Sequence, residues 1–261
     1  MRRTVTCLLA ITAVIAGASL ATAKDWKTIR VGTDATYPPF ESVDASGAFV
    51  GFDIDILKAI CADVGATCTF VNQDFDGIIP ALLAGKFDTI DSSLSITAER
   101  AKSIDFTNKY YNTPPAIVAR KDAGIKGVTK EDLAGKTIGV QSSTTHANYA
   151  QQTYTDSTVK LYPSADQFKL DLVNGRLDAV NDDIVVLSDW MKSAPEAKEC
   201  CVLVGTVKLV PAIHGEGIGF GVRKEDKDLT ALLNKGIADI LANGTYKKIN
   251  DKYFDFNAYG E

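Results

Sequence analysis

The amino-acid sequence predicts an α/β protein made of two lobes, each built on a largely parallel sheet. From Lys24 onward, short runs rich in β-branched residues alternate with patterns of helical period. The motif Gly, basic, apolar, Asp, small, β-branched occurs at 85–90 and again at 175–180, each time between a helical pattern and an expected strand. We therefore expect the same helix-to-strand unit once in each lobe.

The first half of the chain gives regular signals for helices and strands. At 52–64 the apolar residues fall on one helical face, and Gly65 follows as a stop signal. The run at 77–84 has the same character and also ends before a glycine. The elements expected here are strands at 28–33, 67–72 and 88–92 and helices at 52–64 and 77–84.

The second half repeats this alternation. The residues Ser164-Ala165-Asp166-Gln167 form a capping box, which predicts the start of a helix. Polar side chains directly follow each expected strand. The elements expected here are a strand at 136–140, a helix from Ser164 to Gly175, a strand at 177–180 that ends before Asn181, and a helix at 228–243.

Two crossings of the chain between the lobes are expected, near 110–112 and near 215–219. With the signal segment expected at 1–23, these crossings divide the rest of the chain into two lobes. The first lobe covers 24–112 and 215–261, and the second covers 113–214. Two connecting segments form a hinge rather than a loose tether. The strand ends of both lobes would then face one cleft, where open α/β sheets bind ligands.

The N-terminus has the three-part pattern of a secretory signal peptide. Arg2 and Arg3 precede an apolar stretch, and small residues end at Ala23, so we expect cleavage before Lys24. The alternative is an uncleaved anchor, but the stretch is shorter than the roughly 20 residues that a membrane span needs.

With 28 Lys and Arg against 33 Asp and Glu, the chain carries a formal charge of −5. No basic cluster is available for a phosphate backbone, so no nucleic acid is expected as a partner.

Signatures of catalysis are absent from the sequence. It has no nucleophile elbow, Walker loop, dinucleotide fingerprint or zinc-protease motif. With two histidines in the chain, a metal cluster has no support, and no cofactor is expected. Instead, charged and hydroxyl side chains follow the strands, a set suited to holding a small zwitterion. They are Asp34, Ser92, Ser93, Ser95, Arg100, residues 141–145 and Asp183.

Several ordered stretches resemble the family 3 periplasmic solute-binding proteins. They are 32–40 (GTDATYPPF), 51–55 (GFDID), 74–80 (DFDGIIP), 92–100 (SSLSITAER) and 252–256 (KYFDF). The resemblance is closest to the branch that binds lysine, arginine, ornithine and histidine. It implies the type II periplasmic binding protein fold, and a monomer without enzymatic activity. Such a protein carries a basic L-amino acid through the periplasm to the membrane permease of an ABC transporter.

The resemblance implies how the ligand α-carboxylate is held. Arg100 would pair with it, helped by backbone N–H groups near Ser95 and Thr145. A guanidinium fork matches a carboxylate in two parallel hydrogen bonds. The helix expected after Thr144 and Thr145 would add partial positive charge at its N-terminus.

The resemblance also assigns the α-ammonium group of the ligand to Ser93 and Asp183. Asp182 is the alternative to Asp183, and counting from the repeated motif favours Asp183. The second lobe departs from the family in two places. Ser143 stands where relatives commonly carry Gly, and His146 stands where the closest branch has Gln, so the contacts of this lobe are less firmly implied.

The resemblance implies that the ligand side chain lies between Tyr37 and Phe75, with Asp34 at its end. Ser92 is counted among the ligand-binding residues as well. A carboxylate at that depth selects a cation, and aromatic faces bind guanidinium and ammonium groups favourably. Tyr37 and Phe75 lie in polar stretches next to Pro or Asp rather than on a periodic apolar face. We therefore assign them to the site rather than to the core.

Cysteine spacing predicts one disulfide. Cys61 and Cys68 close a short loop in an exported protein and match the bridge of the same branch, whereas two separate buried thiols are the alternative. Cys200 and Cys201 are adjacent, and a bridge between neighbours is strained, so we expect two reduced thiols at the start of a strand.

Two other functions stay open at this point. One is an enzyme of the cyclohexadienyl or arogenate dehydratase kind, which uses the same fold but needs an acid beside the ring of its substrate. The other is an opine receptor, which needs a second arginine for the additional carboxylate. The sequence offers neither group in a suitable place.

Overall fold

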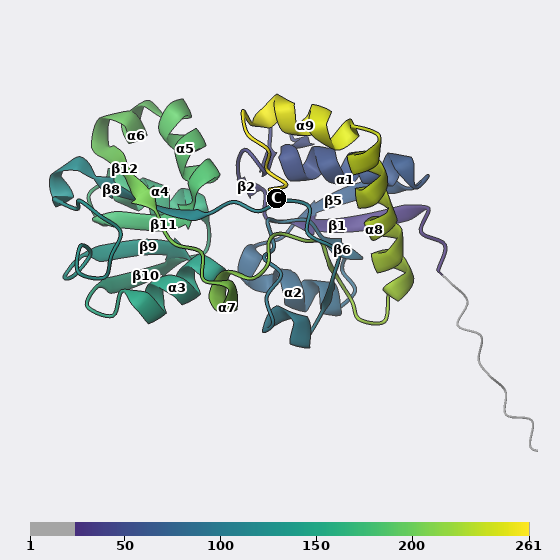
Figure 1. Cartoon of the computed structure of the whole chain (residues 1–261), viewed down its shortest axis with the longest axis horizontal. Helices are drawn as coiled ribbons and strands as arrows, with labels where there is room; N and C mark the ends of the chain where they lie inside the picture. Colours follow the sequence, from purple (N-terminus) through teal and green to yellow (C-terminus); the bar gives the residue numbers. More distant parts are fainter. Residues whose placement is uncertain (1–23, 261) are drawn as a thin grey trace, which may run out of the picture.

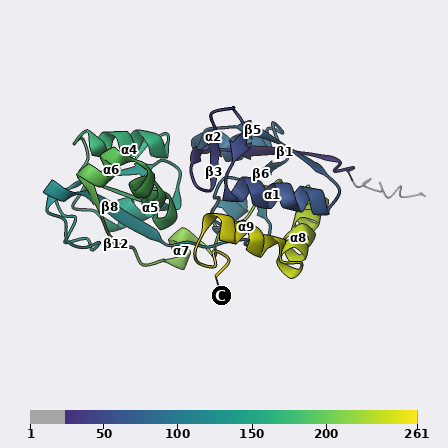
Figure 2. The ribbon, with the colours of Figure 1, turned by 90° about the horizontal axis from the view of Figure 1, so that it is seen from above.

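The computed structural model describes residues 24–260 as two α/β lobes that lie side by side along the long axis of the molecule (Figure 1). Each lobe has its own sheet and its own helices (Figure 2). The expected signal peptide, 1–23, lies outside the described residues. Within 24–260, no helix is both long and apolar enough to cross a membrane.

The sheet of the first lobe contains β1 (Thr28–Thr33), β5 (Thr67–Asn72), β6 (Thr89–Ile90), β7 (Asp105–Phe106) and β13 (Gly221–Val222). The strand order is β5-β1-β6-β13-β7. β5, β1 and β6 are parallel, whereas β13 is antiparallel to both β6 and β7. The expected largely parallel sheet is thus mixed at one edge, because β13 enters it on the return from the second lobe.

Five helical segments complete the first lobe. Three of them pack against one another, and these are α1 (Phe52–Asp63), α8 (Lys227–Ala242) and α9 (Thr245–Tyr253). α2 (Phe75–Leu83) contacts β1 and β6, and a short 3-10 helix covers Arg100–Lys102. A small antiparallel sheet leads from β1 to α1 and consists of β2 (Thr36–Tyr37), β3 (Glu41–Val43) and β4 (Phe49–Val50).

The sheet of the second lobe has the order β10-β9-β11-β8-β12 and is also mixed. β10, β9 and β11 are parallel, and β8 is antiparallel to both β11 and β12. Its strands are β8 (Pro115–Arg120), β9 (Thr137–Gln141), β10 (Thr158–Tyr162), β11 (Ala179–Asp183) and β12 (Cys201–Thr206). Its helical segments are Lys121–Ala123 (3-10), α3 (Thr145–Thr153), α4 (Ala165–Val173), α5 (Ile184–Ser193), α6 (Pro195–Cys200) and α7 (Pro211–His214).

The chain crosses between the lobes twice, after β7 and before β13, and the two crossing segments run side by side (Figure 1). Tyr111 on the outward segment pairs with Ile218 on the return segment, and Ser95 pairs with Ile218 as well. Backbone pairing therefore ties the hinge to the loop that carries Ser95. The lobe limits predicted at 112 and 215 fall in these segments, and their exact positions stay predictions.

Most predicted elements are present, with limits within one or two residues of the expected ones, and three details differ from the prediction. β11 includes Asn181 to Asp183 instead of ending before them, because their backbones pair with residues 115–117 of β8. α2 begins at Phe75, two residues before the expected start. α4 begins after Ser164 as expected, but the Ser164 side chain makes no capping hydrogen bond.

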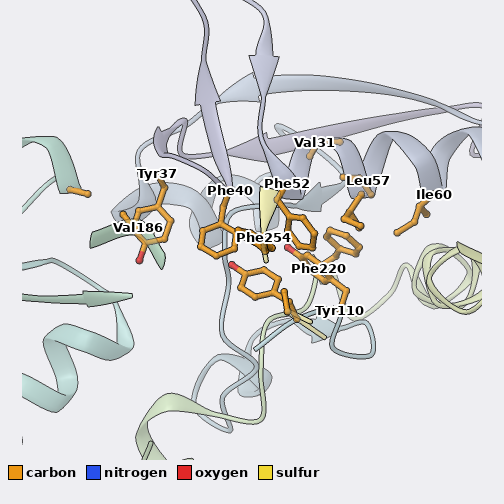
Figure 3. Close-up of a cluster of buried hydrophobic side chains, with 14 of the residues drawn as sticks. Val31, Tyr37, Phe40, Phe52, Leu57, Ile60, Tyr110, Val186, Phe220 and Phe254 are labelled. Carbon is orange, nitrogen blue, oxygen red and sulfur yellow. The ribbon is translucent and has the colours of Figure 1, made fainter. Parts of the chain in front are cut away.

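Aromatic side chains form the core of the first lobe beside the hinge (Figure 3). Phe40 stacks on Tyr111 with ring centroids 4.7 Å apart, and Tyr110 stacks on Phe220 at 4.3 Å. Phe52 lies 4.9 Å from Phe254 near the C-terminus. Both hinge segments are therefore anchored in a packed core.

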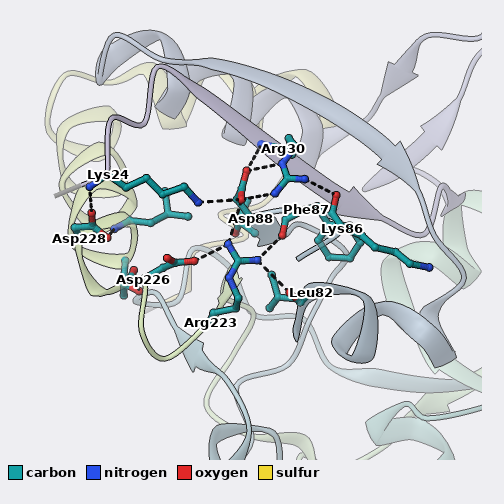
Figure 4. A network of polar contacts seen from close by, with 12 residues as sticks. Lys24, Arg30, Leu82, Lys86, Phe87, Asp88, Arg223, Asp226 and Asp228 are labelled. Carbon is teal, nitrogen blue, oxygen red and sulfur yellow. Dashed lines mark hydrogen bonds and ion pairs between the residues drawn. The ribbon is translucent and has the colours of Figure 1, made fainter. Parts of the chain in front are cut away.

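The repeated motif has a structural role, since its aspartate binds the backbone of the neighbouring parallel strand in each lobe, β1 in the first and β9 in the second. Asp88 accepts the backbone N–H of Arg30 at 3.1 Å, and Asp178 accepts that of Thr137 at 2.7 Å. Asp88 also pairs with the guanidinium groups of Arg30 and Arg223 (Figure 4). These contacts hold the pKa of Asp88 down at about 2, although burial alone would raise it.

Both pairs of cysteines in the described residues are joined. Cys61 and Cys68 connect α1 to β5 with Cα atoms 6.0 Å apart, which confirms the predicted disulfide. The prediction of two reduced thiols at Cys200 and Cys201 is wrong, because the structure joins them. The backbone changes from helical to extended at this step, where α6 ends and β12 begins.

Candidate functional site

All ten side chains of the predicted site line two adjoining cavities between the lobes. Tyr37, Ser93, Ser95 and Thr145 border both cavities. One cavity also contains Asp34, Phe75, Ser92, Arg100 and Thr144, and the other contains Asp183. The fold thus gathers residues from 34 to 183 in one place, and their contact with a ligand stays a prediction.

Asp34 lies directly after β1 and is 6% exposed. Its backbone N–H donates to Ser92 Oγ at 2.9 Å, and Thr36 Oγ1 donates to Asp34 Oδ1 at 3.0 Å. Gln141 Nε2, from the second lobe, donates to Asp34 Oδ2 at 2.7 Å. Burial raises the pKa of Asp34 because the carboxylate loses water, although the hydrogen bonds from Gln141 and Thr36 offset part of this effect.

Tyr37 and Phe75 belong to short elements rather than to the polar loops expected for them. Tyr37 is part of β2, is 9% exposed, and donates its hydroxyl to Asp182 Oδ1 of the other lobe at 2.5 Å. Phe75 is the first residue of α2 and is half-buried. The Phe75 ring centre lies 5.5 Å from the guanidinium carbon of Arg100.

Arg100 opens a 3-10 helix and reaches across the cleft. Its Nη1 donates to the carbonyl oxygen of Ser95 at 2.9 Å, and its Nη2 donates to that of Ser143 in the second lobe at 3.0 Å. Partial removal from water lowers the pKa of Arg100 to about 10, which leaves the group cationic at neutral pH. Among residues 24–260, no carboxylate lies within ion-pair distance of it.

The second lobe presents the N-terminus of α3 to the cleft. Thr144 caps this helix, because its Oγ1 accepts the backbone N–H of Ala147 at 3.0 Å. Ser143 adopts a left-handed φ of 60°, which turns the chain into the helix. The Oγ1 of Thr145, the first helical residue, lies 3.4 Å from Ser95 Oγ of the first lobe. The helix start therefore adds partial positive charge to the side of the cleft that holds Arg100.

Asp183 ends β11 and caps α5. Its Oδ1 accepts the backbone N–H of Val185 at 2.7 Å, and its Oδ2 accepts the hydroxyl of Thr113 in the hinge. Burial raises the pKa of Asp183 to about 7 because these neutral donors compensate only part of the lost hydration. A cationic group next to Asp183 would therefore favour its ionised form.

Asp182, the alternative to Asp183, contacts different groups. Besides the Tyr37 hydroxyl, it has His146 Nε2 at 3.4 Å. Burial raises the pKa of Asp182 to about 6 and lowers the pKa of His146 to about 4, so the imidazole is neutral at pH 7. Asp182 thus joins the two lobes through Tyr37, and His146 borders both cavities.

Sequence reasoning missed several residues of the cavities. Glu41, at the start of β3, borders the first cavity, and Tyr111, Thr113 and His214 border the second. None of them directly follows a strand of the two large sheets, which was the signal for residues such as Asp34, Ser92 and Asp183, and the resemblance that placed Tyr37 and Phe75 assigned them no role. Glu41 directly follows the stretch 32–40, and only the fold shows that its side chain borders the cavity.

The lobes contact each other through side chains of the site. Besides the contacts of Asp34, Tyr37 and Arg100 already described, Ser142 Oγ of the second lobe donates to Asp76 Oδ2 of the first at 2.7 Å. The charges in the cleft are unbalanced. Arg100 provides one cation without a carboxylate partner, whereas Asp34, Glu41 and Asp183 make no ion pair with any side chain of 24–260. The cleft therefore suits a small molecule with one anionic and more than one cationic group.

Two α/β lobes, a double crossing and a polar cavity between them define a two-lobed solute-binding protein, the class in which a hinge closes over a small ligand. The model of the bacterial extracellular solute-binding proteins, family 3, matches residues 29–256. The chain belongs to this family.

The chain aligns with named relatives over almost its whole length. The L-arginine-binding protein of Pseudomonas aeruginosa is 43% identical over 244 residues, which are 93% of this chain and 93% of that protein. The lysine/arginine/ornithine-binding periplasmic protein of Escherichia coli is 42% identical over 237 residues, 90% of each chain. A Salmonella typhimurium periplasmic binding protein, whose structure was described for its high arginine specificity, superposes with a TM-score of 0.80 at 34% identity. That match covers 87% of this chain and 99% of the other.

Proposed function

We propose that this protein is the periplasmic substrate-binding component of an ABC importer for basic L-amino acids, with arginine, lysine, ornithine and histidine as the candidate ligands. The unbalanced charge of the cleft carries this proposal. A zwitterion with a cationic side chain supplies one carboxylate for Arg100 and two cations for the unpaired carboxyl groups. The names of the relatives support the same ligand class.

The proposed roles of the residues are those that the family resemblance implies, and the position of these residues around the cavities supports them. The α-carboxylate pairs with Arg100 and approaches the N-terminus of α3 beside Thr145. The α-ammonium contacts Ser93 and Asp183. The cationic side chain extends toward Asp34, which exchanges neutral partners for a charged one and thereby stabilises its own ionised form.

The proposed location and partner follow from the family and the N-terminus. After cleavage before Lys24, the mature chain diffuses as a monomer in the periplasm and delivers its ligand to a membrane permease. Neither a cofactor nor catalysis is part of this function. The proposed test is direct, since purified mature protein can be offered each amino acid separately.

Calorimetry should detect binding of at least one basic L-amino acid with a dissociation constant between micromolar and nanomolar, about −8 to −12 kcal/mol. Glutamate and leucine should bind far more weakly, because they leave the Asp34 carboxylate without a cationic partner. Tighter binding of glutamate or leucine than of arginine and lysine would exclude the proposed ligand class.

Ligand should also close the lobes, because Arg100 and Asp183 belong to different lobes and the proposed ligand contacts both. Small-angle scattering of the mature protein with saturating arginine should give a smaller radius of gyration than without it. Glutamate at the same concentration serves as the control and should leave the radius unchanged. An equal radius with bound arginine, with binding verified by calorimetry, would contradict closure.

A further inference from the structure

Three buried carboxyl groups lie together behind Ser93. Glu41 is 1% exposed, and Asp53 and Asp91 are fully buried. None of the three makes an ion pair with a side chain of 24–260. Asp53 Oδ1 and Asp91 Oδ2 also have no hydrogen-bond partner there. Buried carboxyl groups without cations destabilise a fold, so their presence beside a ligand cavity points to a role in binding.

The fold brings the three groups together through a close backbone approach. Asp53 lies in the first turn of α1, and its backbone N–H donates to the carbonyl oxygen of Phe40 at 3.0 Å. This contact requires Gly51, which has a φ of 135° and where a Cβ would lie 2.0 Å from the same oxygen. The start of α1 is thereby pressed against the backbone that leads into Glu41. Asp91 follows β6 and reaches the group from the central sheet.

The carboxyl groups hold Ser93 in an unusual conformation. Ser93 has a φ of 48°, and its backbone N–H donates to Asp53 Oδ2 at 3.1 Å. Its hydroxyl donates to Glu41 Oε2 at 3.1 Å and accepts the hydroxyl of Tyr111 at 2.7 Å. Tyr111 belongs to the hinge segment that pairs with Ile218. Ser93 is therefore connected to the hinge as well as to the carboxyl groups.

These contacts fix the hydrogen-bonding character that Ser93 presents to the cavity. A hydroxyl has one proton and two lone pairs. Glu41 takes the proton and Tyr111 occupies one lone pair, so the second lone pair is left as an acceptor. An acceptor backed by carboxyl groups suits an ammonium group and disfavours an anion.

We propose that Glu41 is a positioning residue for the α-ammonium group of the ligand, acting through Ser93 and, with Asp53, supplying negative charge behind it. This inference rests on the proposed function and deepens it. It assigns recognition of the ammonium end to a second set of carboxyl groups besides Asp183. Glu41 itself borders the same cavity as Ser93.

The same arrangement couples binding to a proton. Burial raises the pKa of Asp53 to about 7 and the pKa values of Glu41 and Asp91 well above their usual range. The ionisable groups that face Glu41 and Asp53 are the carboxyl groups of Asp91 and Asp34 and the neutral hydroxyls of four tyrosines, so no cation balances this pair. The tyrosines are Tyr37, Tyr110, Tyr111 and Tyr246. An incoming ammonium group favours the ionised forms, so binding releases a proton, and the affinity decreases as the pH falls through the raised pKa values.

Calorimetry on the mature protein with three ligands distinguishes recognition of the α-ammonium from recognition of the cationic side chain. Arginine has both an α-ammonium group and a cationic side chain. Citrulline keeps the α-ammonium but has a neutral side chain, and 5-guanidinovaleric acid has the guanidinium but lacks the α-ammonium. Glu41→Gln should weaken arginine and citrulline by a similar factor of about ten, the size expected for losing a charged hydrogen-bonding partner. It should change 5-guanidinovaleric acid less than threefold. Proton release with arginine, measured in buffers of different ionisation enthalpy, should fall as well.

The control is Glu131→Gln, which removes the same charge from the exposed surface of the second lobe and should alter neither affinity nor proton release. An equal effect of Glu41→Gln on all three ligands, or no effect on arginine, would overturn the proposal. If Glu41→Gln does not fold, Asp53→Asn tests the same pair from α1 with the same expected pattern. Failure of the wild-type protein to bind any basic amino acid would instead refute the proposed function, before any variant is measured.

Discussion

Replacing Arg100 with alanine should weaken every amino-acid ligand by at least about a hundredfold. The proposed contact is a pair of charge-assisted hydrogen bonds to the α-carboxylate, each worth about 1.5 to 3 kcal/mol. All α-amino acids share that carboxylate, so arginine and lysine should lose affinity by similar factors. Calorimetry or a competition assay with both ligands measures this.

The Arg100 variant needs two comparisons. Arg176→Ala removes an arginine whose side chain is 65% exposed and pairs with Asp171, so it should leave binding unchanged. Arg100→Lys keeps the charge but loses the planar fork, and it should recover only part of the affinity. The hydrogen bonds from Arg100 to Ser95 and Ser143 also join the lobes, so circular dichroism must show that the variant is folded. Retention of full affinity by folded Arg100→Ala would remove the carboxylate assignment.

The elements with strong local signals could be predicted from the sequence alone. β1 and β5 have the predicted limits, because each is a β-rich run with clear polar boundaries. The predicted site residues lie together because the strand ends of both sheets face one cleft, which follows from topology rather than from detail. The resemblance to a family added the role expected for each residue, which residue types alone do not determine.

Other features depend on long-range contacts that a single sequence does not reveal. β11 extends through two aspartates because its backbone pairs with β8, and this pairing outweighs the polar side chains. Glu41 is buried because Gly51 allows α1 to press against the backbone of its neighbour Phe40, a contact between residues eleven positions apart in the sequence. Cys200 and Cys201 are joined where a helix meets a strand, a geometry that spacing alone argues against.

Asp34→Asn should remove the preference for a cationic side chain while leaving recognition of the amino-acid end intact. Arginine and citrulline have nearly the same shape, but only arginine is charged at its end. The wild-type protein should prefer arginine by a factor of at least about thirty, because a charge-assisted hydrogen bond is about twice as strong as a neutral one and Asp34 is buried. In Asp34→Asn the two ligands should differ by less than about fivefold.

The matched control is Asp74→Asn, because Asp74 is an exposed carboxylate whose charge acts on Asp34 without bordering the cavity. It should leave the ratio of the two affinities within about twofold of the wild-type value, whereas a long-range effect of net charge would lower the ratio in both variants.

The pH dependence of binding provides a second measure of the role of Asp34. The pKa of Asp34 is raised by burial, and a bound guanidinium lowers it, so the preference for arginine is full above the raised pKa and decreases as the pH falls through it. Asp34→Asn should abolish this part of the pH dependence. If Asp34→Asn instead lowered the affinities for arginine and citrulline by equal factors, Asp34 would only support the cavity wall, and another residue would have to bind the cationic end of the ligand.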